Sequence, residues 1–342
     1  TLDRSSAASD VYKRQVLDER RKPSYLPLIG IALVLVLSFV SLFVGVHDLG
    51  VNHLLSLDDL QVKVLLTTRL PRTISLVLAG ASLSVAGLLM QKLTQNKFVS
   101  PTTAGTMASA RFGAILSMVI FAGATYFQRI LFAFVCASLG TLIFLLFLRT
   151  VKRNKSMMVP LVGMMFGNIV SSVGSYIALR YDLVQNANSW FQGNFSLVTS
   201  DNYQLIFLAL PVFILIYLFA HYFTVMALGQ EMATELGVSY RVIELVGILL
   251  VALGTTAVLL TVGSIPFIGI IVPNLISLKG GDNFQKMLLP TAIFGSVFTI
   301  VCDILARIVI APYELPISVV VGVSGSILFL FLLLRGERKL AK

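Results

Sequence analysis

Three arginines at the ends of apolar runs have the chemistry to bind carboxylates. Arg69 and Arg72 flank Pro71 where one run begins, and Arg307 lies near the end of another. A guanidinium group binds a carboxylate through two parallel hydrogen bonds, so such cations can dock an acidic protein surface. Anchoring of the helix ends to lipid head groups would suit the same side chains. Because Arg307 should reach the level of the other two, we predict one cationic rim that docks a partner protein.

Two further charged side chains, Asp303 and Arg111, lie inside apolar runs. Ionisable groups are costly there and are usually functional. Asp303 precedes Arg307 by four residues, so both fall on one helix face and can form an ion pair. Arg111 lies about half-way along another run and has no evident partner in its own helix. It either bonds to carbonyl groups of a neighbouring broken helix or faces an anionic cargo, and the sequence leaves both interpretations open.

A short polar segment, Ala227–Arg241, separates the apolar runs 203–226 and 242–262. Glycines lie toward both of its ends, and Glu231 and Glu235 lie between them. A membrane protein that keeps a compact, helix-competent polar element between two spans usually docks something on it. We therefore predict that this segment binds another protein.

The sequence lacks the usual residues of a catalyst. It contains no G-x-x-x-x-G-K-[ST] and no G-x-G-x-x-G motif, so it cannot cradle a nucleotide by the usual loops. Its three histidines, His47, His53 and His221, form no metal-ligand spacing with cysteines or carboxylates. No nucleophile and base stand out either. We predict a conduit that is not an enzyme and needs no cofactor or metal of its own.

The elements that must position these residues are membrane spans. Hydrophobic residues make up 57% of the 342 residues and charged ones 12%, with a mean hydropathy of +0.90, beyond the range of soluble domains. A spanning helix needs roughly 20 mostly apolar residues. The sequence predicts an all-α polytopic membrane protein with about ten spans. They are expected near 27–46, 73–91, 102–121, 130–148, 158–179, 203–223, 242–262, 266–278, 286–309 and 316–334.

The basic residues fall in alternate loops and not in one stripe, which argues against nucleic-acid binding. With the N-terminus placed inside, these loops lie in the cytoplasm, so the positive-inside rule places both termini there. The same topology puts Ala227–Arg241 on the cytoplasmic side and the arginine rim on the outer side. The expected cytoplasmic cations are Lys92, Lys97, Arg149, Lys152, Arg153, Lys155, Arg241, Lys279, Lys286, Arg335, Arg338 and Lys339.

Three stretches follow from this topology. Residues 1–25 form a cytoplasmic tail, of which 1–15 are polar and are either disordered or an artefact of the reading frame. Residues 26–336 form the transmembrane domain, and 337–342 form a second cytoplasmic tail. Within the domain, Pro273 lies inside an apolar run, so that helix should kink or break and leave backbone groups that are buried in protein or line a cavity.

An ordered set of sequence blocks resembles the FecCD-type permease subunits of ABC importers for iron-siderophores, haem and vitamin B12. The blocks run in order from about residue 26 to the C-terminus, so the resemblance covers nearly the whole chain. They are Arg69-Leu-Pro-Arg-Thr73, Ala79–Gly87, Gln91, Thr94-Gln-Asn96, Ser100-Pro101, Leu228-Gly229, Glu231, Leu236-Gly-Val238, Phe267–Pro273, Leu289-Pro290, Asp303–Arg307 and Glu314-Leu-Pro316.

The resemblance implies a type II ABC importer permease fold of ten helices and a permease dimer with the pathway at its interface. It also implies two ATPase subunits on the cytoplasmic face and an extracellular or periplasmic substrate-binding protein in a bacterial cell membrane. Arg69, Arg72 and Arg307 match the family's outer arginines, which meet acidic residues of the binding protein. The element 228–238 matches the part that sits in a cleft of the ATPase, and its candidate coupling residues are Leu228, Gly229, Glu231, Ala233, Leu236 and Gly237.

One departure from the family pattern bears on the cargo. Many members carry histidine after the Ile-Val-Pro sequence, where this chain has Asn274. Together with Val99–Thr106 and Arg111, this variant looks like the branch that imports ferric catecholate or mixed-ligand siderophores, often as a heterodimer of paralogous permeases. Arg111 would then face an anionic chelate, and Arg111, Pro273 and Asn274 are the candidate residues of the translocation path.

Two alternatives remain beside the ferric siderophore permease. Within the family, the cargo would be haem or vitamin B12. From another class, the chain would be a secondary transporter, which predicts a mid-membrane ion site or an acid relay. The spans hold almost no acidic residue apart from Asp303, so we favour the importer.

Overall fold

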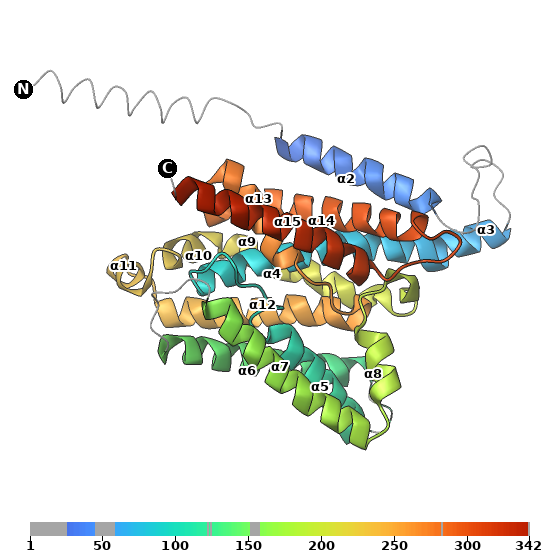
Figure 1. Cartoon of the computed structure of the whole chain (residues 1–342), viewed down its shortest axis with the longest axis horizontal. Helices are drawn as coiled ribbons and strands as arrows, with labels where there is room; N and C mark the ends of the chain where they lie inside the picture. Colours follow the sequence, from blue (N-terminus) through green and yellow to red (C-terminus); the bar gives the residue numbers. More distant parts are fainter. Residues whose placement is uncertain are drawn as a thin grey trace, which may run out of the picture.

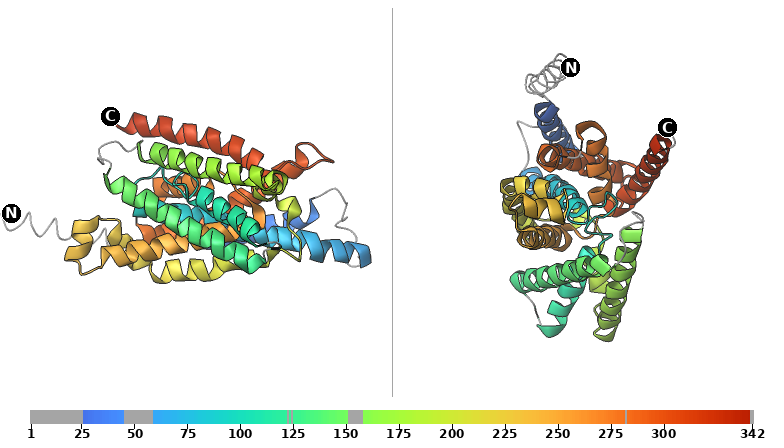
Figure 2. Two further views of the ribbon diagram at one scale, coloured as in Figure 1. Left: turned by 90° about the horizontal axis from the view of Figure 1, so that it is seen from below. Right: turned by 90° about the vertical axis from the view of Figure 1, so that its left-hand side faces the viewer.

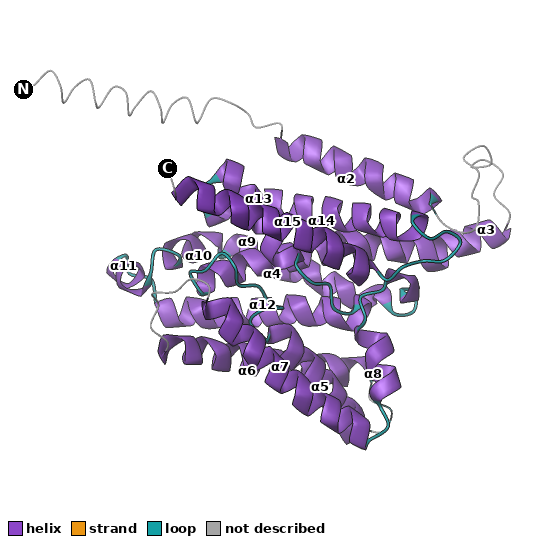
Figure 3. Cartoon of the chain, viewed as in Figure 1, coloured by secondary structure: helices purple, strands orange, loops and turns teal. Residues whose placement is uncertain are grey.

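The computed structural model describes residues 26–44, 59–121, 123, 125–150, 158–281 and 283–340. Its described elements are helical, and the only bridge among them is an isolated one between Gln192 and Ser264 (Figure 3). The predicted tail 1–25, residues 45–46 of the first expected span, and His47 and His53 lie outside the described residues. The helices are α2 (Leu26–Phe43), α3 (Asp59–Val64), η2 (Leu65–Arg69), α4 (Leu70–Leu93), α5 (Thr106–Ile120), α6 (Tyr126–Thr150), α7 (Met158–Arg180), α8 (Val184–Phe191), η3 (Phe195–Leu197), η4 (Tyr203–Leu208), α9 (Ala209–Leu218), α10 (Ala220–Met226), α11 (Gln230–Glu235), α12 (Tyr240–Val262), α13 (Ile268–Gly280), α14 (Phe284–Ile308) and α15 (Ile317–Leu340).

The number of apolar helices agrees with the prediction of about ten spans. Among the described residues, five helices are long and apolar enough to cross a membrane, and one bent pair makes a sixth. Four shorter apolar helices, at Pro27–Phe43, Thr106–Ile120, Ile268–Leu278 and Ile317–Leu332, coincide with the remaining expected spans. The prediction of an all-α polytopic membrane protein is therefore confirmed.

The expected span at 203–223 is not a single straight helix. Tyr203–Leu218 and Ala220–Met226 meet at an angle of 61° around Phe219, which adopts φ −88° and ψ 4°. The bend buries Ala220, Phe223 and Met226 completely, and the ring of Phe223 packs against Phe284 of α14 at 5.6 Å. Burial of one face of α10 against α14 thus accounts for a bend that hydropathy alone does not reveal.

Helix α4 forms the centre of the bundle and packs against α12, α13 and α14 (Figures 1 and 2). Two glycines let its backbone touch its neighbours. A Cβ added at Gly87 would lie 2.0 Å from the carbonyl oxygen of Gly269 in α13, and one at Gly80 would lie 2.4 Å from that of Gly295 in α14. Small residues at such contacts allow the close helix packing typical of membrane proteins.

The bundle has two distinct ends (Figure 1). Helix α11 protrudes at one end, whereas α3 and α8 lie at the other. The amino end of α2 and the carboxyl end of α15 point toward the α11 end. The two candidate protein-binding regions, the segment around α11 and the arginines near α3, are therefore separated by the length of the bundle.

Candidate functional site

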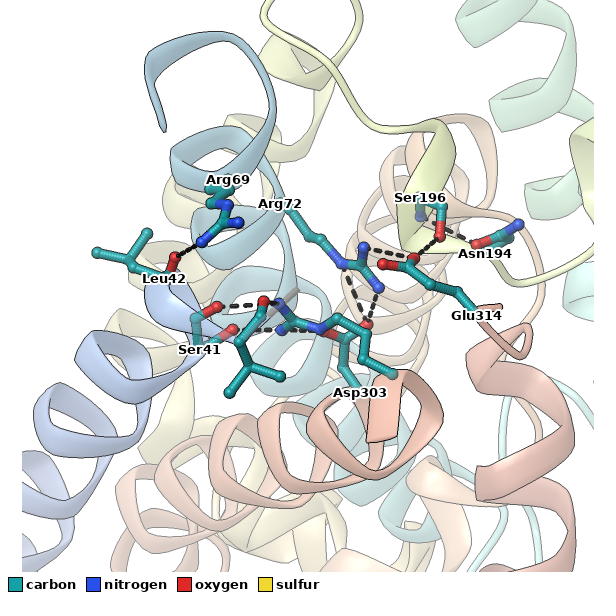
Figure 4. A network of polar contacts seen from close by, with 10 residues as sticks. Ser41, Leu42, Arg69, Arg72, Asn194, Ser196, Asp303 and Glu314 are labelled. Carbon is teal, nitrogen blue, oxygen red and sulfur yellow. Dashed lines mark hydrogen bonds and ion pairs between the residues drawn. The ribbon is translucent and has the colours of Figure 1, made fainter. Parts of the chain in front are cut away.

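Arg69 and Arg72 of the predicted rim lie near Asp303 at the end opposite α11 (Figure 4), and Arg307 binds the same Asp303. Arg69 is the last residue of η2, Arg72 lies in the first turn of α4, and Arg307 lies in the last turn of α14. Pro71 lies where η2 continues into α4, and because it has no N–H, the carbonyl of Thr67 four residues earlier accepts from the amide of Ser200 instead, at 2.9 Å. The continuous η2–α4 segment fixes the spacing of Arg69 and Arg72.

Arg72 bridges two carboxylates. Its Nη2 donates to Oδ1 of Asp303 at 2.8 Å, and its Nη1 donates to Oε2 of Glu314 at 2.8 Å. Its side chain is 11% exposed, and that of Asp303 is 1% exposed. The guanidinium group therefore ties α4 both to α14 and to the segment that joins α14 to α15.

Arg307 and Arg69 hold the carboxyl end of α2. Arg307 donates to the carbonyl oxygens of Ser41 and Val44, to the hydroxyl of Ser41, and to Oδ2 of Asp303. Arg69 donates to the carbonyl oxygen of Leu42 at 2.6 Å. The last carbonyls of a helix have no partner within it and carry partial negative charge, so these two cations cap α2.

This geometry confirms the predicted Asp303–Arg307 pair and adds partners that sequence reasoning did not assign. The three arginine side chains are largely buried and turn toward carbonyls and carboxylates of their own chain. We call Arg69, Arg72, Asp303, Arg307 and Glu314 the charge cluster. It contains three cations and two anions, and so retains one net positive charge.

Glu314 extends the charge cluster to the segment after α8. It accepts a hydrogen bond from the hydroxyl of Ser196 in η3 and binds Arg72. Burial alone would raise the pKa of Glu314, but the hydrogen bond from Ser196 and the charge of Arg72 outweigh it, so this pKa lies below its usual value. The signal in the sequence was the motif Glu314-Leu-Pro316, whose carboxylate directly precedes a span.

The predicted docking segment Ala227–Arg241 contains the short helix α11 and its flanking turns. Gly229 precedes the helix with φ 108° and ψ 165°, and Gly237 follows it with φ 75°. Side chains with a Cβ rarely adopt these conformations, so glycine is needed at both turns. The amide of Val238 then donates to the carbonyl of Ala233, which closes the element into a compact unit.

The same segment presents apolar and acidic side chains outward. Leu228, Met232 and Leu236 are between 53% and 60% exposed, and Glu231 and Glu235 are exposed beside them. Ala233 is fully buried and faces the bundle. The segment therefore offers an apolar ridge with acidic edges at the tip of the bundle, as a partner-binding surface requires.

The candidate path residue Arg111 packs against α8. Its Nη2 donates to Oδ1 of Asn188 at 3.4 Å, and its guanidinium carbon lies 5.0 Å from the ring centre of Phe191. Among the described residues it makes no ion pair that the structure records with a carboxylate. A half-buried cation held by an amide and an aromatic ring keeps its charge available to an anion.

The candidate path residues Pro273 and Asn274 lie on α13, which stays one helix from Ile268 to Gly280. The helix was expected to kink or break at Pro273, and it does not break there. Pro273 has no N–H to donate to the carbonyl of Gly269, and that oxygen accepts instead from Nε2 of Gln91 at 3.4 Å. The side chain of Asn274 donates to the carbonyls of Lys97 and Ile270. Arg111 and Asn274 thus make contacts with different parts of the chain.

No group of three His, Cys, Asp or Glu side chains within the described ranges could hold a metal ion. The candidate sites offer hydrogen-bond donors and fixed charges. In this structure the cations among them bind carboxylates and carbonyls of the same chain.

Comparison with known proteins places the chain in a family of transporters. A model of the FecCD transport family matches residues 33–335. The petrobactin import system permease protein YclN of Bacillus subtilis is 46% identical over 303 residues, which cover 89% of this chain and 96% of that protein. The petrobactin import permease FatD of Bacillus anthracis is 37% identical, covering 91% of each chain. The ferric-anguibactin permease FatD of Vibrio anguillarum is 34% identical, covering 87% of this chain and 95% of that one.

Solved structures support the same fold. An ABC transporter of the metal-chelate type in an inward-facing conformation matches with a TM-score of 0.77 at 22% identity, covering 91% of this chain and 99% of that one. The family match spans most of the chain, so the resemblance drawn from the sequence blocks is confirmed: this membrane protein belongs to the FecCD transport family.

Proposed function

We propose that this chain is the permease subunit of an ABC importer that carries a ferric siderophore of the catecholate or mixed-ligand class into the cytoplasm. The observation that carries the cargo assignment is the similarity, along nearly the full length, to permeases named for petrobactin and ferric-anguibactin. An organic chelator would hold the iron, which accords with a permease that relies on hydrogen bonds and fixed charges.

The energy would come from two partner ATPases that bind the segment 227–241. The exposed Leu228, Met232 and Leu236 suit an apolar cleft, and the backbone hydrogen bond from Val238 to Ala233 closes the element into a compact unit that could transmit movement. ATP binding would draw two such elements together and rock the spans between two arrangements. In this scheme the α11 end, both termini and the tails 1–25 and 337–342 are cytoplasmic, and residues 26–336 form the permease domain.

The charge cluster at the opposite end would receive the extracellular substrate-binding protein. Acidic residues of that protein would compete with Glu314 and Asp303 for the forks of Arg72 and Arg307. Docking would then loosen the ties between α2, α4 and α14. A signal of this kind couples arrival of cargo to the arrangement of the spans.

A second permease subunit, which we expect to be a paralogue, would complete the pathway. Helix α7 supports this, because only 22% of its apolar stretch is buried within the chain. Arg111, Pro273 and Asn274 are the residues proposed for the cargo path, with Arg111 attracting an anionic chelate.

Reconstitution tests the cargo. The purified permeases, their ATPases and the binding protein are placed in vesicles, and ATP hydrolysis is measured with ferric petrobactin, a ferric hydroxamate, haem or vitamin B12. We expect stimulation by ferric petrobactin and a several-fold loss in Arg111→Gln, with Lys286→Gln as a control on an exposed cation in the first turn of α14. Stimulation by haem or vitamin B12 alone would refute the siderophore assignment.

A further inference from the structure

A polar cavity lies near the α3–α8 end of the bundle, apart from the charge cluster. It has a volume of about 260 Å³ and lies between the start of α6, the end of α8 and the end of α12. The side chains that define its chemistry are Tyr126, Arg129, Trp190, Asn202 and Thr261. None of its lining residues is a carboxylate, so Arg129 gives the cavity a net positive charge.

Arg129 is held in the cavity by aromatic rings. Its guanidinium carbon lies 4.2 Å from the ring centre of Trp190 and 5.7 Å from that of Tyr126. Its Nε is buried and has no hydrogen-bond partner among the described residues. A guanidinium group stacked on an aromatic face is positioned without an anion, and its donors can then bind one.

The two asparagine side chains that line the cavity are engaged in hydrogen bonds to their own loop. The side chain of Asn202 accepts from the amide of Thr199 and donates to the carbonyl of Leu197, so it is committed to its own loop. The amide oxygen of Asn194 accepts from the backbone of Ser196. These bonds shape the wall of the cavity and leave Arg129 as the group that selects for negative charge.

The surroundings of the cavity are those of a bilayer surface. Only a third of the apolar stretch of α6 is buried within the chain, and its exposed face begins at Phe127 and continues through Leu131, Val135 and Leu139. Tyr126 and Trp190, both about half exposed, lie at the Phe127 end of this face. Tyrosine and tryptophan at the end of a span mark the boundary between hydrocarbon and head groups.

We propose that this cavity binds the phosphate of an anionic phospholipid, with Arg129 as its ligand and Trp190 as its wall. A molecule that combines a negative charge with a long apolar chain matches a partly buried guanidinium group at the end of an apolar helix face. The acyl chains would lie along Phe127, Leu131 and Val135 of α6. The bound lipid would brace α8 against α12, because Trp190 lies in the last turn of α8 and Thr261 in the last turn of α12. This site does not depend on the nature of the cargo.

Trp190 itself provides the probe, since it is the only tryptophan of the chain. The purified full chain in an uncharged detergent is titrated with phosphatidylglycerol that carries a nitroxide near its glycerol backbone. We expect saturable quenching of Trp190 fluorescence. Loss of one charge-assisted hydrogen bond weakens binding by about tenfold, so Arg129→Gln should raise the half-saturating lipid concentration by at least that factor.

Two variants serve as controls for misfolding and for long-range charge effects. Arg129→Lys keeps the charge but loses the planar fork, so its half-saturation should lie between the wild type and Arg129→Gln. Arg180→Gln removes an exposed arginine that ends α7 and should leave the titration unchanged. Native mass spectrometry, which does not use tryptophan, should show one phosphatidylglycerol retained by the wild type and lost from Arg129→Gln.

Competition identifies the source of the anion. Unlabelled phosphatidylglycerol should restore the fluorescence, whereas millimolar inorganic phosphate or a ferric siderophore should not. Equal quenching of the wild type and Arg129→Gln overturns the proposal. Displacement of the lipid by inorganic phosphate or by the chelate also overturns it, because the site would then serve a soluble anion.

Discussion

One carboxylate oxygen of Asp303 lies 2.8 Å from Nη2 of Arg72, and its other oxygen binds Arg307. A single buried anion thus stands between two cations from α4 and α14. Because Arg307 also caps α2, the position of three helices depends on Asp303. The arrangement gives the charge cluster a structural role beside the docking role proposed for it.

Asp303→Asn should strongly destabilise the protein. The substitution leaves Arg72 and Arg307 buried without their shared anion, and breaking a buried ion pair costs about 3–5 kcal/mol. Thermal unfolding in detergent, followed by circular dichroism, should show a clear drop in midpoint. Glu314→Gln, at the more exposed side of the cluster, should lower the midpoint much less. Equal midpoints for Asp303→Asn and the wild type would refute the role of Asp303.

The pH dependence of stability should carry a contribution from Glu314. Its folded pKa lies below the ordinary value of 4.5, so the unfolded chain binds more protons in acid. The stabilisation is therefore complete above pH 4.5 and is lost as the pH falls below 4.5 through the folded pKa. Unfolding midpoints measured on both sides of pH 4.5 should fall less steeply in Glu314→Gln than in the wild type. Parallel curves for the two proteins would contradict the assignment.

Glu314→Gln should strengthen docking of the proposed binding protein. Glu314 occupies Nη1 of Arg72 with a negative charge, and the neutral amide oxygen of glutamine would compete less well with a carboxylate of the partner. A charge-assisted hydrogen bond contributes about 1.5–3 kcal/mol, which limits the gain to roughly a hundredfold in affinity. Surface plasmon resonance with the reconstituted complex measures it.

Two variants control the docking measurement. Arg72→Gln should weaken docking, and Asp182→Asn should leave it unchanged, because Asp182 is an exposed carboxylate between α7 and α8 and has no recorded ion pair among the described residues. If neither Arg72→Gln nor Glu314→Gln alters the affinity, the charge cluster is purely structural.

Sequence patterns predicted the number of spans and the Asp303–Arg307 pair because both depend on local spacing. Hydropathy detects apolar length, and an i, i+4 separation fixes one helix face. The partners of Arg72 could not be inferred this way, since Glu314 is 242 residues away along the chain. Nor could the bend at Phe219, which depends on the packing of α10 against α14.

The burial of the three arginine side chains could not be predicted from the sequence either. Their position at span ends predicted a rim exposed to solvent. In the structure, Arg69 and Arg307 instead donate to carbonyl oxygens at the end of α2. The effect of Pro273 on its helix could not be predicted from the sequence for a similar reason. A proline in a span predicts a break, but whether a distant donor such as Gln91 replaces its N–H depends on the fold.

Gly237→Ala should impair coupling between ATP hydrolysis and uptake. A left-handed conformation costs a residue with a Cβ about 1–2 kcal/mol, so the turn after α11 should shift or loosen. Uptake per ATP hydrolysed should fall several-fold in vesicles. Gly123→Ala is the control, because Gly123 also has a positive φ of 86°, lies between α5 and α6, and has open space around its Cβ position. An equal effect of both variants would show that strain alone, and not the coupling segment, is responsible.

Gln91 and Pro273 should be energetically coupled through the carbonyl of Gly269. Gln91→Leu leaves this buried oxygen without its side-chain donor and should destabilise the protein by about 1–3 kcal/mol. Pro273→Ala restores a backbone N–H that can donate to the same oxygen four residues earlier, so Gln91→Leu should cost less in that background. Unfolding midpoints of the two single variants and the double variant complete the cycle. Additive effects would mean that Gln91 stabilises the protein by packing between α4 and α13 and not by replacing the N–H that proline lacks.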